Sequence, residues 1–166
     1  MSASPLTPAV ADRSPVVSDA TAALAVVADR LALAELVSRL GRWLDDPASC
    51  VPGSLLAADV TVRSPGGESA GLDRVVAQAE RTHAAVTTQH VMTDVIVDLD
   101  GDDARLTANL LVAFLAPGDA SLAPSYRSGS RYAFGARRTP AGWRLTRIEV
   151  DPVWQLGERP VPPAAG

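Results

Sequence analysis

The second half of the sequence consists of long segments that alternate apolar and polar residues and are separated by short turn sequences, which restricts the fold more than any other feature. Alternation with a period of two is typical of β-strands that bury one face. Asp100-Gly101 is a sequence that two-residue hairpins favour, and Thr139 to Gly142 is also typical of a turn. Four strands of an antiparallel sheet are therefore predicted, over residues 88–99, 104–116, 126–138 and 143–150.

The first half of the sequence follows helical spacing instead. Its apolar residues recur in steps of three and four, which predicts a long helix from Asp19, as its cap, to Asp45. This apolar stripe comprises Leu33, Leu36, Val37, Leu40 and Leu44. Asp46-Pro47 predicts the start of a short helix, and a further helix is predicted over residues 72–86, after a short strand at 58–64.

The grouping of helices before strands predicts an α+β domain over residues 19–157. A strongly curved antiparallel sheet that wraps around about three helices forms a conical barrel, and its open mouth is a natural small-molecule pocket. The proline-rich segments 1–18 and 158–166 are predicted to be disordered tails.

Composition argues against several classes of function. The formal net charge of −4 is unfavourable for a nucleic-acid partner, since such proteins need a clustered basic surface. No apolar run reaches the roughly 18 residues of a membrane span, and no secretory signal pattern is present, so we predict a soluble, cytoplasmic protein with no membrane partner. A single cysteine, Cys50, and two histidines without a clear third ligand predict no metal site. Glycine-rich nucleotide-binding motifs and a nucleophile elbow are missing, so no cofactor is predicted.

Four groups of residues, taken in order, carry a resemblance to a known family. They are residues 29–37 with 44–46, residues 56–62, residues 88–91 with 95–102, and residues 131–132 with 138–140 and 142–145. These groups resemble the first helix, first strand, central hairpin and closing strands of SnoaL-like proteins, within the nuclear-transport-factor-2-like superfamily. The resemblance implies a conical α+β barrel that is often dimeric. Its members include polyketide cyclases, dehydratases, ketosteroid isomerases and epoxide hydrolases, and other members only bind or assemble.

The resemblance also implies a catalytic pair. In the dehydratase-like branch an aspartate near the end of the first helix pairs with a histidine on the central strand, and Asp45 and His90 occupy these positions. That branch often has a tyrosine five residues before the aspartate, where this chain has Leu40. A histidine exchanges protons near neutral pH, and a carboxylate can orient it and stabilise its charged form. A structural histidine and an aspartate that begins a turn remain the alternatives.

Five further residues are candidates for contact with a substrate: Tyr132, Asn109, Asp94, Trp43 and Met92. Strand alternation places Met92 and Asp94 on the same face as His90. Tyr132 can donate a phenolic proton, and Asn109 can aim its amide at a carbonyl. Each candidate also has a structural alternative, as a core side chain, a solvated strand residue or a hydrogen-bonded amide. His83 is expected to be exposed on its helix.

Two functions from different classes stay open. The first is a cofactor-independent acid–base enzyme of the cyclase, dehydratase or isomerase type, which acts on an apolar oxygenated small molecule in bacterial secondary metabolism. The second is a protein of the same fold that binds a small molecule or assembles without chemistry. A homodimer is predicted in either case, through a sheet face that carries Val91, Val95 and Val97 or their opposite neighbours.

Overall fold

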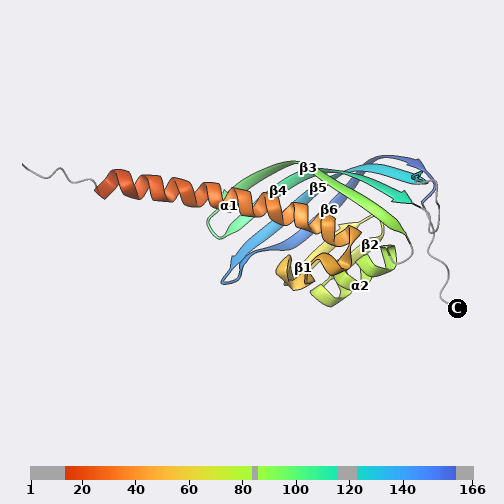
Figure 1. Cartoon of the computed structure of the whole chain (residues 1–166). Coiled ribbons are helices and arrows are strands. Elements are labelled where there is room, and N and C mark those ends of the chain that lie inside the picture. Colours follow the sequence, from red (N-terminus) through yellow and green to blue (C-terminus); the bar gives the residue numbers. More distant parts are fainter. Residues whose placement is uncertain (1–13, 84–85, 116–122, 160–166) are drawn as a thin grey trace, which may run out of the picture.

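The computed structural model describes residues 14–83, 86–115 and 123–159 of the chain, with side chains from residue 19 onward. Two α-helices and six strands make up these residues, so the predicted α+β class is confirmed (Figure 1). In chain order the elements are α1 (Ser14–Asp45), η1 (Pro47–Ser49), η2 (Pro52–Ser54), β1 (Leu56–Ser64), β2 (Gly67–Ala70), α2 (Leu72–His83), β3 (Thr87–Asp100), β4 (Asp103–Leu115), β5 (Tyr126–Thr139) and β6 (Gly142–Gly157).

The six strands form one sheet in the order β2-β1-β6-β5-β4-β3. Neighbouring strands are antiparallel, except that β1 runs parallel to β6. Figure 1 shows this sheet curving over α1 and α2. Because β2 and β3 stand at opposite ends of the order, the sheet is curved but open, and the predicted barrel does not close.

Helix α1 is held against the sheet by its apolar stripe and by polar contacts with the free edge of β3. The stripe residues Leu33, Val37 and Leu40 are buried. Near one end of the contact, the Arg30 guanidinium donates to the Val97 carbonyl oxygen at 2.5 Å. At the other end, the Asp45 carboxylate accepts the backbone N–H of His90. The helix therefore satisfies backbone groups that β3 would otherwise leave unpaired.

The ends of several elements differ from the predictions. Helix α1 begins at Ser14, inside the predicted tail, so Asp19 lies within the helix and is not its cap. Strand β6 continues past the predicted end at Val150 to Gly157, because it stays paired with β5 over that length. Residues 1–13 and 160–166 of the predicted tails lie outside the described residues.

Two short elements were also predicted incompletely. The short helix after Asp46 consists of two separate 3-10 turns, and Asp46 does cap the first by accepting the N–H of Ala48. Strand β2 was not predicted, since its four residues follow the Pro65-Gly66 turn without an apolar pattern.

A bulge in β3 reverses the alternation of its side chains. The register with β4 shifts between Thr93 and Ile96, and Asp94 adopts a φ of 53°. Before the bulge, Thr88 and His90 face inward, whereas after it the inward residues are Val95, Val97 and Leu99. The prediction that Asp94 shares a face with His90 is therefore wrong. For the same reason Val95 and Val97 do not lie on the exposed face that was predicted for a dimer.

Candidate functional site

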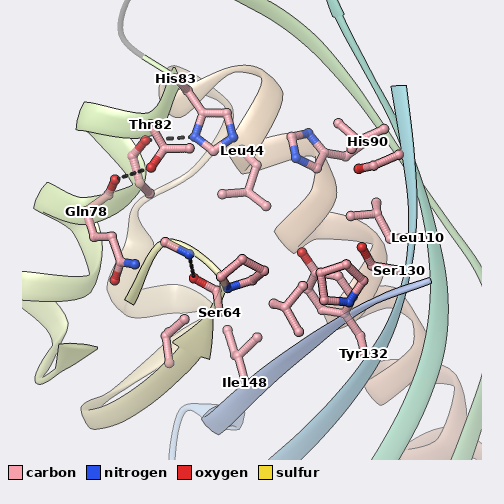
Figure 2. A pocket seen from close by; sticks show the side chains of 18 of the residues that line it. Leu44, Ser64, Gln78, Thr82, His83, His90, Leu110, Ser130, Tyr132 and Ile148 are labelled. Carbon is pink, nitrogen blue, oxygen red and sulfur yellow. Dashed lines mark hydrogen bonds between the residues drawn. The ribbon is translucent and has the colours of Figure 1, made fainter. Parts of the chain in front are cut away.

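A cavity of about 420 Å³ lies between the inner face of the sheet and the two α-helices. Apolar side chains from α1, β4 and β6 form much of its wall, among them Leu40, Trp43, Leu110, Val112, Phe114 and Ile148. A volume of this size suits a small ring compound. Figure 2 shows His83 and Gln78 of α2 on one side of the cavity and His90, Ser130 and Tyr132 of the sheet on the other.

The predicted pair of Asp45 and His90 is assembled in the cavity wall. His90 Nδ1 lies 2.6 Å from Asp45 Oδ1, and the imidazole is only 5% exposed. Because an ionised carboxylate can only accept, Nδ1 carries the proton of the neutral ring. The lone pair is then on Nε2, on the side of the ring away from Asp45. His90 lines the cavity, so it is placed to act as a base there.

Asp45 remains ionised at the C-terminal end of α1, where the helix dipole disfavours a negative charge. Burial raises the pKa of Asp45, but hydrogen bonds from the His90 side chain and backbone and from the Thr88 hydroxyl outweigh it. The pKa of this carboxyl group is therefore lowered from its ordinary value. The Thr88 hydroxyl donates at 2.9 Å and the His90 N–H at 2.9 and 3.0 Å.

A second histidine faces the cavity, contrary to the expectation that it is exposed. His83 Nδ1 lies 2.7 Å from the Ala79 carbonyl oxygen, and the His83 and His90 rings are 5.3 Å apart between centroids. Burial lowers the pKa of His83, despite the hydrogen bond to Ala79 that raises it, so its ring is neutral at pH 7. A carbonyl only accepts, so Nδ1–H donates to it and Nε2 keeps its lone pair.

The sequence did contain a signal for His83. It lies four residues after Ala79, and so continues the inner stripe of α2 that Leu72, Val75 and Ala79 begin.

Hydroxyl groups of β5 form the polar part of the opposite wall. Tyr132 is buried, and this burial raises its pKa to about 12, so the phenol stays protonated and can donate. Ser128 and Ser130 are buried as well and line the cavity. Neither serine was predicted from the sequence, although both alternate with Tyr132 along the same strand face.

The other predicted contacts divide into two groups. Trp43 lines the cavity, as Tyr132 does. Met92 faces inward but packs against α1, where a Cβ on Gly41 would lie 3.3 Å from Met92 Cγ, and it is not part of the cavity wall. Asp94 and Asn109 lie on the outer face of the sheet, with Asn109 Nδ2 donating to Asp94 Oδ2 at 2.8 Å. The structure thus does not bring Met92, Asp94 or Asn109 to the cavity.

Neither a metal centre nor a membrane span is found among the residues that the structure describes. Within residues 14–83, 86–115 and 123–159, no three His, Cys, Asp or Glu side chains are grouped as metal ligands would be. The helices in the same ranges are too short or too polar to cross a bilayer.

A search of curated protein sequences gave no significant match. The family model of the SnoaL-like domain matches residues 25–149, more than half of the chain.

Several solved structures share the fold at low sequence identity. The Kfla4162 protein of Kribbella flavida is 22% identical, with a TM-score of 0.69 over 79% of this chain and 95% of its own. A scytalone dehydratase candidate from Novosphingobium aromaticivorans is 15% identical, with a TM-score of 0.67 over 84% of this chain and 96% of its own. A type 2 hexachlorocyclohexane dehydrochlorinase, LinA, is 17% identical, with a TM-score of 0.68 over 86% and 99%. The fold of this chain is also that of a nuclear-transport-factor-2-like protein from Salmonella enterica, which is 13% identical with a TM-score of 0.67. The family-model match shows that the chain belongs to the SnoaL-like domain family.

Proposed function

We propose that this protein is a cofactor-independent acid–base enzyme that removes a proton from an apolar, oxygenated small molecule. The observation that carries the proposal is the Asp45–His90 pair, which leaves one unprotonated imidazole nitrogen at the wall of a mostly apolar cavity. The reaction is an elimination or an isomerisation, which places the enzyme in the lyase or isomerase class.

The first step is proton transfer from carbon. The substrate ring packs between apolar residues such as Leu40 and Val112, with a C–H bond next to its carbonyl group directed at His90 Nε2. The proton moves to Nε2, the electron pair of the C–H bond forms a carbon–carbon double bond, and the π pair of the carbonyl group moves onto its oxygen to give an enolate. The Asp45 carboxylate, 2.6 Å from Nδ1, stabilises the imidazolium that forms.

The negative charge on the substrate oxygen needs a donor. Tyr132 suits this role because it remains a neutral phenol, and the Ser130 hydroxyl lies on the same strand face. His83 Nε2 offers an acceptor across from His90 and holds a substrate hydroxyl group. The enolate then expels a leaving group or takes the proton back at another carbon.

Two of the structural neighbours have names that refer to eliminations, a dehydratase and a dehydrochlorinase. Both are under 20% identical to this chain, so they support the fold alone. The support for acid–base chemistry comes from the geometry of Asp45, His90 and Tyr132.

A non-catalytic binding protein is the second candidate function. Leu40 favours it, because this buried side chain in the cavity wall is apolar where the dehydratase-like branch often has a tyrosine hydroxyl. Such a protein would use the same cavity and release its ligand unchanged.

The experiment incubates the purified protein with a library of cyclic ketones and hydroxyketones and follows each compound by mass spectrometry and proton exchange. For a compound that is converted, His90→Ala should reduce the rate about 10²–10⁴-fold, because a positioned base contributes that much.

Gln89→Ala is the matched control, since Gln89 is exposed on the same strand as His90 and the variant should retain the wild-type rate. A loss below about threefold in His90→Ala would rule out His90 as the base. Recovery of every bound compound unchanged would support the binding protein instead.

A further inference from the structure

The ionisable side chains of the cavity wall are unevenly distributed. The chain has 19 acidic residues and a net charge of −4, yet none of the described residues that line the cavity is Asp or Glu. Asp45 is turned toward Thr88 and His90 and is not part of the lining. Arg159 is the one guanidinium among the described lining residues, beside two imidazoles. The wall therefore presents a positive charge without a negative one.

The end of β6 is built so that Arg159 reaches the cavity. Gly157 has a φ of 85°, and a Cβ at this position would collide with the Ser125 carbonyl oxygen. The chain turns there, and the N–H of Glu158 donates to the same carbonyl oxygen at 3.2 Å. The Arg159 guanidinium carbon then lies 5.0 Å from the centre of the Phe114 ring. A glycine, a backbone hydrogen bond and an aromatic ring thus direct this side chain.

The charge of Arg159 is available to a ligand. Arg159 forms no ion pair with any residue in the described part of the chain, and its side chain is exposed. Arg159 lies close enough to Tyr132 and His83 for its positive charge to affect both pKa values. Burial raises the pKa of Tyr132, and the charge of Arg159 opposes this rise. Burial lowers the pKa of His83, and the charge of Arg159 lowers it further. A ligand that occupies the cavity next to Tyr132 is therefore within reach of this charge.

We propose that Arg159 binds the carboxylate group of the ligand, so that the protein takes small cyclic carboxylic acids whose ring fills the apolar cavity. A guanidinium stacked on an aromatic face keeps its edge N–H groups free, and these match the two oxygens of a carboxylate. The inference rests on the proposed function only in using the same cavity. It concerns binding and does not require turnover.

The test compares two probes that differ in charge and hardly in shape, 1-naphthoate and 1-naphthamide. Binding of each is measured by calorimetry at neutral pH. The wild type should bind the naphthoate about fivefold more tightly, as expected for a solvent-accessible ion pair worth up to about 1 kcal/mol. Arg159→Gln should lose this preference while it still binds the naphthamide. Arg127→Gln is the matched control, because Arg127 is an exposed residue of β5 outside the cavity lining.

A second variant separates position from charge. Gly157→Ala keeps the guanidinium but opposes the turn that delivers it, so it should also lose the preference for the naphthoate. Thermal unfolding of each variant shows whether the fold is intact. Equal binding of the two probes to the wild type, no binding of the naphthoate, or an unchanged preference in Arg159→Gln would overturn the proposal.

The outcome is independent of catalysis. If the preference depends on Arg159 but no substrate is ever converted, the carboxylate site stands and the enzymatic proposal fails.

Discussion

Asp45 serves both the fold and the candidate chemistry. Its carboxylate accepts the backbone N–H of His90 at the edge of β3, the hydroxyl of Thr88 and the imidazole N–H of His90. The resemblance to SnoaL-like proteins was sufficient to predict the pair of Asp45 and His90. It could not predict the contact with the backbone of β3, because that contact depends on how α1 crosses the sheet.

The stability of the protein should depend on pH through Asp45. The pKa of this group is lower in the folded state, so its contribution to stability is complete above the unfolded pKa of about 3.9 and is lost as pH falls through the folded value. Asp45→Asn should therefore lower the free energy of unfolding by about 1–3 kcal/mol at neutral pH and by less in acid. Urea denaturation of the wild type and of Asp45→Asn, at neutral pH and in acid, measures the loss of unfolding free energy under each condition.

The control for this experiment is Asp98→Asn, which changes an exposed carboxylate of β3, the strand whose backbone Asp45 contacts. It should leave the free energy of unfolding nearly unchanged at both pH values. An equal loss for Asp45→Asn in acid and at neutral pH would contradict the assigned role of the carboxylate.

Both histidines should carry their proton on Nδ1 when they are neutral. In His90 this nitrogen donates to Asp45, and in His83 it donates to the Ala79 carbonyl. Nitrogen-15 NMR of the imidazole rings distinguishes the two tautomers, and a His83→Asn variant assigns the signals. A proton on Nε2 of His90 would leave this residue without a lone pair that faces the cavity, and His90 could not be the base.

At the scale of the elements, the sequence was most informative where one period continues without interruption. The apolar stripe of α1 and the alternation of β4 and β5 predicted those elements within a few residues. The bulge at Asp94 was not predictable from alternation, since it inserts a residue without a glycine or proline to mark it. This one residue explains why Asp94 was placed on the same face as His90, and Val95 and Val97 on the outer face.

Asp94 holds a left-handed backbone conformation, with a φ of 53°. Glycine adopts this conformation without strain, whereas a β-branched residue does not. Asp94→Gly and Asp94→Val both remove the hydrogen bond to Asn109, so the difference between them isolates the backbone. We expect Asp94→Val to be less stable by about 1–2 kcal/mol in chemical denaturation. Equal stability of the two variants would mean that the bulge relaxes in solution.

At the scale of the whole molecule, the outer face of the sheet carries an apolar row across four strands. The paired residues Val91, Leu111, Gly129 and Trp154 lie side by side in β3, β4, β5 and β6. Trp154 packs over Gly129, where a Cβ would collide with its indole, and remains 47% exposed. The neighbouring row carries both signs of charge, with Arg131 opposite Asp151. A face that is apolar and bears both charges can pair with a copy of itself.

We therefore expect a homodimer through this outer face. Trp154→Glu should yield a monomer, because it places a charge in the apolar row that the contact would bury. Leu24→Glu is the matched control, since it changes an exposed apolar residue of α1 away from the sheet. Sedimentation velocity at micromolar concentration measures the mass of each form. A wild-type monomer, or a dimer that persists in Trp154→Glu, would reject this interface.

The position of α1 along the edge of β3 also affects how the protein behaves among other copies of itself. An open sheet has two edge strands to which a strand of another molecule can add, and such addition can begin fibril growth. The longer edge strand is β3, with 14 residues, and α1 lies along it with Arg30 and Asp45 hydrogen-bonded to its backbone. The other edge strand, β2, is only four residues long. The protein can therefore contain long, strongly alternating strands and still expose only a short strand edge to which a strand of another molecule could add.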